Sequence, residues 1–259
     1  MKKLINPPLK LASPRILGFF LLTILFSPFN MAETIRIGLV DYPPHLNLNS
    51  DIKKSKLYQY IESTFTSQGL KVLFTEYTQK RGEVELEKGE IDLLLPFEGK
   101  DKQIKVLSRP LFHSTPGLCF KKDNFIPILS ASHLFKDLVI GIPAGANILP
   151  VLKDSGALLV ILEGIDATSR GIDLTQRGRI DAFYHPSPTK IYQQENLKLN
   201  KVVCSYFHGY SAGVFIATSP LMDPDMYKLI NQIYTNAFME LSYEYYFAKN
   251  IEIPIVTNQ

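Results

Sequence analysis

Apolar and polar positions follow strand and helix periods by turns along the chain. The apolar runs at 35–40 and 138–142 are typical of buried strands, and prolines follow both, which cannot donate to a sheet. Positions 57, 60, 61, 64 and 65, which are apolar except for Thr64, and the apolar positions through 227–241 have the spacing of helices. Strands that alternate with helices predict mainly parallel sheets with helices on both faces.

A repeated segment divides this α/β pattern into two similar halves. Residues 87–92 (EKGEID) precede LLLP, and residues 176–181 (QRGRID) precede AFYHP. In each copy the glycine suits the left-handed position after a helix, and the basic residue complements the helix dipole. Chance similarity between short α/β segments is the alternative, because glycine often follows a helix. The repeat predicts two lobes.

The order of the predicted elements makes one lobe discontinuous in sequence. Residues 117–121 (GLCFK) and 213–218 (GVFIAT) would connect the lobes as a two-stranded hinge that absorbs the rotation of closure. Lobe 1 then comprises 33–117 and 213–259, and lobe 2 comprises 118–212. The predicted fold class is therefore α/β, with two lobes around a cleft.

The first 32 residues have the pattern of a secretory signal peptide. Basic residues precede an apolar run of 11 residues at 16–26, which is too short to span a bilayer, and Ala32 offers a small residue for cleavage. An uncleaved membrane anchor is the alternative. We expect cleavage near Ala32 and export to the periplasm.

This segment also accounts for the apparent basicity of the chain. The chain has 28 Lys+Arg and 25 Asp+Glu, and residues 1–32 hold four of the bases and none of the acids. The remainder carries 24 bases and 25 acids, which does not favour a nucleic-acid partner. The five histidines show no metal-ligand spacing and no glycine-rich phosphate loop is present, so we expect no metal and no cofactor.

The chain contains two cysteines, Cys119 and Cys204. After export they would either form a disulfide or remain as two buried thiols, and their spacing does not decide between these states. A disulfide across this separation would contribute about 4 kcal/mol by the loop-entropy model.

Candidate binding residues follow from the rule that ligands of open α/β sheets bind beyond the carboxyl ends of the strands. A helix start at 145–147 would favour an anion, Arg170 would clamp an acid group, and Tyr42 would provide an aromatic wall. The candidate ligand-binding residues are Asp41, Tyr42, Phe97, Glu98, Lys102, Ser114, Thr115, Gly145, Ala146, Asn147, Arg170, Tyr184 and His185.

Each of these candidates also has a purely structural interpretation. Asp41 would cap a turn and Tyr42 would cover the core, while 98–102 would be a solvated turn. Arg170 would be a surface residue of a helix. Asp92 and Asp181, which recur in the repeat, are assigned to the turn between helix and strand.

Five segments in order carry a resemblance to a known family: IRIGLVDYPP (35–44), KGEIDLLLP (88–96), SRPLFHSTPGLCF (108–120), DLVIGIPAG (137–145) and RGRIDAFY (177–184). With them the chain resembles the family 3 extracellular solute-binding proteins, the periplasmic amino-acid carriers of ABC importers. The resemblance implies a type 2 periplasmic-binding-protein fold and a monomer. It also implies that the lobes close on a small polar ligand, which is delivered to a membrane permease.

The sequence departs from the family where the ligand is bound. Amino-acid-binding members typically carry a Thr-Pro-Glu-Arg-like element whose arginine grips the ligand carboxylate, whereas residues 98–103 read EGKDKQ, with Lys102 nearest that arginine. A lysine lacks the bidentate fork. The acid of lobe 2 that usually meets the ammonium has no counterpart, because Tyr184 and His185 occupy its neighbourhood. These departures leave open a ligand other than a standard amino acid.

Two other classes of function remain open. A dehydratase-like enzyme on the same fold would use Glu98 and His185 as general acid or base. The G-x-S-x-G motif at 209–213 does not support a serine hydrolase, because a strand-like segment follows it and no histidine comes later in the chain. The second of these classes is a sensor module that docks on a membrane receptor.

Overall fold

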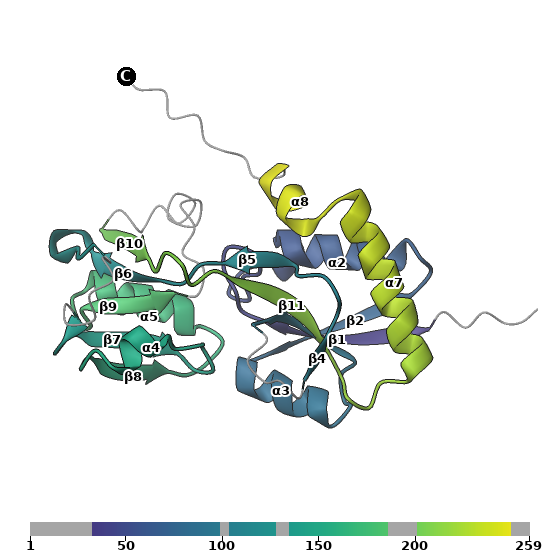
Figure 1. Ribbon diagram of the computed structural model, residues 1–259, viewed down its shortest axis with the longest axis horizontal. Helices are drawn as coiled ribbons and strands as arrows, with labels where there is room; N and C mark the ends of the chain where they lie inside the picture. The colour runs from purple at the N-terminus through teal and green to yellow at the C-terminus, as the bar shows by residue number, and fades with distance from the viewer. Residues whose placement is uncertain (1–32, 99–103, 128–134, 186–200, 250–259) are drawn as a thin grey trace, which may run out of the picture. The chain divides into compact units, whose positions relative to one another are not determined.

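The computed structural model describes residues 33–98, 104–127, 135–185 and 201–249 (Figure 1). Residues 34–259 group into one compact unit. The strands are β1 (Thr34–Val40), β2 (Lys71–Tyr77), β3 (Leu93–Phe97), β4 (Lys105–Val106), β5 (Phe112–Ser114), β6 (Gly117–Lys121), β7 (Val139–Pro143), β8 (Leu158–Leu162), β9 (Ala182–His185), β10 (Val202–Tyr206) and β11 (Ala212–Thr218). The helices are α2 (Lys56–Thr66), α3 (Gln79–Glu87), α4 (Pro150–Lys153), α5 (Ala167–Gln176), α7 (Pro224–Glu240) and α8 (Tyr243–Lys249), with 3-10 turns η1 (Ile52–Lys54) and η2 (Lys122–Asn124).

The first sheet has the order β2-β1-β3-β11-β4, and β5 pairs with β11. β1, β2 and β3 are parallel, whereas β11 runs antiparallel to its neighbours. Helices α2, α7 and α8 cover one face and α3 covers the other (Figure 1). Leu93 and Leu95 point into the core with α2 and α7, and Leu94 points toward α3, as the two-residue period of a strand requires.

The second sheet has the order β10-β6-β9-β7-β8. β7 pairs in parallel with β8 and β9, and β6 runs antiparallel to β9 and β10. Ile140 packs with Leu152 of α4 on one face, and Phe183 packs with Ile172 of α5 on the other. The predicted α/β class is confirmed, and each sheet combines a parallel set of three strands with antiparallel strands.

The chain passes from the first sheet to the second between β5 and β6 and returns between β10 and β11 (Figure 1). The predicted strands at 117–121 and 213–218 are present, but each is a member of one sheet: β6 belongs to the second and β11 to the first. The short links between the sheets are therefore 115–116 and 207–211. Rotation about them stays a prediction.

In both halves an aspartate joins the Ile-Asp segment to the opening strand. Oδ2 of Asp92 accepts a hydrogen bond from the backbone N–H of Arg36 at 2.7 Å, and Oδ2 of Asp181 accepts one from that of Val139 at 2.8 Å. Asp92 also forms an ion pair with the Arg36 guanidinium at 2.7 Å. The two carboxylates thus hold neighbouring strands together, rather than the helix-to-strand turn assigned to them.

The glycines of the two opening strands have the same packing role. A Cβ on Gly38 would lie 2.5 Å from Cδ1 of Ile91, and a Cβ on Gly141 would lie 2.7 Å from Cδ1 of Ile180. The isoleucine of each Ile-Asp pair therefore fills the space that a side chain would need. This shared packing gives the internal repeat a physical cause.

Cys119 of β6 and Cys204 of β10 form a disulfide. The two residues lie directly opposite each other in the antiparallel pair, so the bond joins an edge strand to the sheet. The alternative of two buried thiols is thereby excluded.

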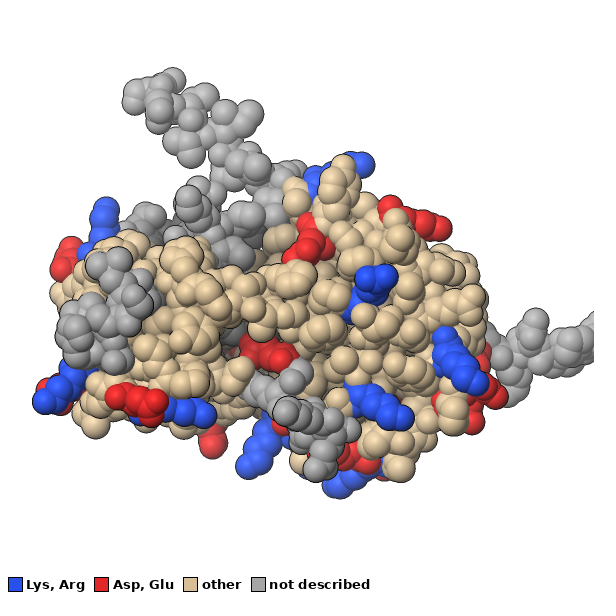
Figure 2. Space-filling view, in the orientation of Figure 1, with Lys and Arg blue, Asp and Glu red and all other residues tan. Residues whose placement is uncertain are grey.

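The predicted signal segment at 1–32 lies outside the residues that the structure describes. Within the described part of the chain, no helix has the length and apolar character needed to cross a bilayer. On the face shown in Figure 2, lysine and arginine side chains are interspersed with acidic ones.

Candidate functional site

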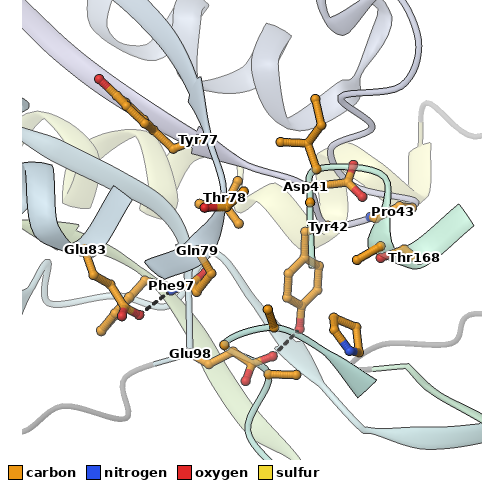
Figure 3. Close-up of a pocket in the computed structure, with 18 of the residues that line it drawn as sticks. Asp41, Tyr42, Pro43, Tyr77, Thr78, Gln79, Glu83, Phe97, Glu98 and Thr168 are labelled. Atoms are coloured by element: carbon orange, nitrogen blue, oxygen red, sulfur yellow. Dashed lines mark hydrogen bonds between the residues drawn. The ribbon is translucent and has the colours of Figure 1, made fainter. Parts of the chain in front are cut away.

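A cavity of about 80 Å³ is lined by residues from both sheets. It lies beyond the carboxyl ends of β1 and β3 in the first sheet and of β7 and β9 in the second, as expected for open α/β sheets. The first residues of α3 and α5 also reach it. Its polar lining residues are Asp41, Tyr42, Tyr77, Thr78, Gln79, Glu83, Glu98, Thr168 and His185 (Figure 3).

Tyr42 stands at the centre of a hydrogen-bond group in this cavity. Its hydroxyl lies 3.2 Å from Oε1 of Glu98 (Figure 3). It also lies 3.0 Å from Oγ of Ser114, which is the last residue of β5. Burial and the neighbouring charge of Glu98 raise the pKa of Tyr42 well above its ordinary value, so the phenol keeps its proton. Tyr42 therefore positions the Glu98 carboxylate at the cavity wall.

Asp41 is a buried acid of the cavity. Its Oδ1 accepts a hydrogen bond from the backbone N–H of Leu48 at 2.9 Å, whereas its buried Oδ2 has no hydrogen-bond partner that meets normal geometry among the described residues. Burial raises the pKa of Asp41 to about 7, the nearby charge of Asp166 adds to this, and the Leu48 N–H and the Thr168 hydroxyl act in the opposite direction. The carboxyl group therefore changes charge close to neutral pH.

The charge of the cavity lining is negative. Asp41, Glu83 and Glu98 contribute carboxylates, and Nε2 of Gln79 donates to Oε1 of Glu83 at 2.6 Å. The lining residues that the structure describes include no lysine or arginine. His185 is fully buried, and burial lowers its pKa to about 3, so it is neutral at physiological pH.

The cavity brings together seven of the residues predicted from the sequence. They come from three strand ends and one loop, in agreement with the rule used to choose them. The seven residues are Asp41, Tyr42, Phe97, Glu98, Gly145, Ala146 and His185. Ser114 lies behind them, against the hydroxyl of Tyr42.

Other predicted residues lie elsewhere. Thr115 is outside the lining, and the hydroxyl of Tyr184 donates to the carbonyl oxygen of Asn147 at 2.5 Å, which uses both groups in internal structure. The guanidinium of Arg170 pairs with Asp166 at 3.2 Å and its side chain is 42% exposed. Lys102 falls outside the described residues.

The helix start predicted at 145–147 is absent. Gly145 has a φ of +82°, and α4 begins only at Pro150. Gly145 instead forms a tight turn after β7 that packs on the first turn of α3, where its Cβ would lie 2.9 Å from Cγ of Gln79. Glycine adopts this left-handed backbone without steric cost, and its lack of a side chain allows the close approach to Gln79.

Several lining residues were missed by the sequence analysis. Thr78 and Gln79 follow β2, and Gly164, Ala167 and Thr168 follow β8. The same strand-end rule, applied to the segments that form β2 and β8, would have found them. Across the described residues, no group of three or more His, Cys, Asp or Glu side chains is placed to hold a metal ion.

A scan of protein-family models and a search of curated proteins each found no match to this sequence. Solved structures do resemble it. The substrate binding protein of an amino acid ABC transporter has a TM-score of 0.66 and 15% identity, and the alignment covers 83% of this chain and 98% of that chain. The arginine-bound form of a truncated ArgBP from T. maritima has a TM-score of 0.65 and 19% identity, with coverages of 78% and 95%.

A third structure is the ancestral amino acid-binding protein AncCDT-1, a precursor of cyclohexadienyl dehydratase. It has a TM-score of 0.66 and 18% identity, and the alignment covers 83% of this chain and 94% of that chain. At these identities the likeness concerns the fold. The chain has the two-lobed α/β fold of the family 3 solute-binding proteins.

Proposed function

We propose that this protein is a periplasmic solute-binding protein that captures a small polar molecule by closing two lobes around it. The lobes would comprise residues 33–117 with 213–259, and residues 118–212. The links between the sheets at 115–116 and 207–211 would act as the hinge. A signal peptide at 1–32 would export the protein, which would act as a monomer and deliver its ligand to the permease of an ABC importer.

One observation carries this proposal: a single cavity is lined by polar groups from both sheets. Asp41 and Glu98 come from the first sheet, and Thr168 and His185 come from the half that contains the second. A ligand that contacts both sets stabilises the closed state by the contacts that it gains there. The fold shared with substrate-binding proteins supports the same conclusion.

An enzyme on this fold is the second candidate, because Glu98 and His185 both line the cavity. A carboxyl group such as Glu98 is able to donate or accept a proton, whereas the pKa of His185, lowered by burial to about 3, makes its imidazole a weak base. The similarity to a protein described as a precursor of a dehydratase is in keeping with this candidate.

A thermal-shift screen of the purified protein tests the function. The panel contains amino acids, amines, small organic acids and sugars, and a ligand at about a hundred times its dissociation constant should stabilise the protein by about 2.7 kcal/mol. Each hit is then incubated with the protein and followed by NMR. Recovery of the unchanged ligand supports a binding protein, whereas turnover supports the enzyme. Failure of every compound to stabilise the protein would contradict both.

A further inference from the structure

We propose that the ligand of this cavity is an organic cation, an amine or a guanidine, that carries no carboxylate group. This inference rests on the proposed solute-binding function and names the chemical class of the solute. It excludes the amino acids themselves, whose carboxylate needs a basic partner or free N–H donors.

The charges around the cavity favour a cation. Asp41, Glu83 and Glu98 line it, and the described lining contains no lysine or arginine. The arginines of the two adjacent helices are used elsewhere, since Arg81 pairs with Glu85 at 2.8 Å and Arg170 pairs with Asp166. An anion would meet like charges in a site of reduced dielectric, where their repulsion is stronger than in water.

The hydrogen-bond partners favour a donor. Glu83 is held by Gln79 and Glu98 by Tyr42, whereas Oδ2 of Asp41 has no hydrogen-bond partner of normal geometry among the described residues, although the Thr168 hydroxyl lies near this carboxyl group. An ammonium or guanidinium group brings several N–H donors and no acceptor. It would supply the missing bond to Asp41 as a charge-assisted hydrogen bond, which a carboxylate is unable to do.

Aromatic rings complete this environment. Tyr42, Tyr77 and Phe97 line the same cavity. The faces of aromatic rings attract cations, and this attraction grows when the cation is removed from water. Carboxylates and aromatic rings together form a lining suited to a positive group.

Other residues of the protein lie against the two helix N-termini at the cavity. A helix N-terminus attracts anions, and both α3 and α5 begin here. The first turn of α5 faces Asp41, which lies near Thr168 (Figure 3). The first turn of α3 is covered by Gly145, whose Cβ would lie 4.0 Å from the backbone nitrogen of Lys80.

Matched pairs of compounds test the inference by isothermal titration calorimetry. Agmatine and arginine differ by one carboxylate, as do putrescine and ornithine, and 4-guanidinobutanoate carries the guanidine with an acid. At about pH 8 Asp41 is ionised. We expect agmatine to bind at least about tenfold more tightly than arginine, or putrescine at least about tenfold more tightly than ornithine. 4-Guanidinobutanoate should bind more weakly than these amino acids.

Variants connect the selectivity to the cavity. Asp41→Asn should weaken binding of the amine at least about tenfold. Asp123→Asn is the matched control, because the Asp123 side chain is 80% exposed and lies outside the cavity lining. If Asp41→Asn does not fold by circular dichroism, Glu83→Gln provides the same test at a second carboxylate.

The outcomes separate this inference from the function on which it rests. Preference for an amine together with its loss in Asp41→Asn supports both. If arginine, ornithine or 4-guanidinobutanoate binds as tightly as the matching amine or more tightly, the cation inference is overturned and the solute-binding function stands. An acid or a sugar found as the ligand in the wider screen has the same consequence. Absence of binding by every compound of both panels overturns the two together.

Discussion

The hydroxyl of Tyr42 lies 3.2 Å from Oε1 of Glu98. Tyr42 follows β1 and Glu98 follows β3, so one hydrogen bond ties the ends of two parallel strands at the cavity wall. The same hydroxyl contacts Ser114 at the end of β5, near the link to the second sheet. The Tyr42 hydroxyl therefore contacts both the cavity wall and the strand that leads into the link between the two sheets.

Tyr42→Phe should therefore weaken ligand binding several-fold and lower the free energy of unfolding by about 1 kcal/mol. The ring stays in place, but Glu98 loses the donor that positions it, and a typical hydrogen bond contributes about 1 kcal/mol. Calorimetry measures the affinity and urea unfolding measures the stability.

Tyr58→Phe is the matched control for this prediction. The hydroxyl of Tyr58 donates to Oε1 of Glu62 at 3.2 Å within α2, away from the cavity lining. This variant should leave the affinity unchanged. An equal loss of affinity in the two variants would show that Tyr42 has no particular role in the site.

Asp41 should make the stability of the free protein depend on pH. Its pKa is about 7 in the folded protein and 3.8 as the ordinary value, so between these the folded state binds more protons than the unfolded state. Stability then falls as pH rises from about 4 to 7, because folding must bury an increasingly charged group. Asp41→Asn removes this effect and should match the wild type near pH 4, but exceed it by more than about 1 kcal/mol near pH 8.

Urea unfolding of both proteins at a series of pH values measures this difference, with Asp123→Asn as the exposed control. A constant difference between Asp41→Asn and the wild type across this range would mean that Asp41 is ionised normally.

Gly145→Ala should reduce ligand affinity about tenfold, since the new Cβ would lie 2.9 Å from Cγ of Gln79 and push apart two segments of the cavity wall. Gly178→Ala is the control: it has a similar left-handed φ of +66°, but its Cβ would meet nothing within 4 Å. Both variants should lose about 1 kcal/mol of stability from backbone strain. Binding affinities that fall equally, or not at all, would argue against the role of the Gly145–Gln79 contact.

Loss of the Cys119–Cys204 disulfide should destabilise the protein by about 4 kcal/mol on the loop-entropy model, because the bond closes a loop between positions 85 residues apart. Urea unfolding with and without reductant measures this. The double variant Cys119→Ala/Cys204→Ala should be as unstable as the reduced protein and insensitive to reductant. A reduced wild type that unfolds at the same urea concentration as the oxidised one would contradict the expectation.

Much of the fold could be predicted because its cause is local. The period of Leu57, Ile61 and Phe65 gives α2, and the repeated Gly and Ile-Asp positions mark the same packing in both halves. The antiparallel positions of β6 and β11 could not be predicted, because a strand's own residues do not identify its neighbours. The pairing of Val203 with Phe120, for example, joins two distant parts of the chain.

The candidate site was predicted where residues directly end a strand, as for Asp41, Glu98 and His185. Arg170 was predicted from its helix position, but its guanidinium pairs with Asp166, one turn earlier, and the residue is not part of the cavity lining. A charge pattern read along the sequence does not show which partner a long side chain selects.

The sequence by itself determined helices α2 and α7, the opening strands β1 and β7 and the presence of two similar halves, because periodicity and turn residues act over a few positions. Only the tertiary structure decided which groups share the cavity, since Tyr42 and Glu98 are separated by 56 positions and meet through the pairing of β1 with β3. It also decided the charge state of Asp41, because an ionisable group responds to its burial and to the atoms around it in space.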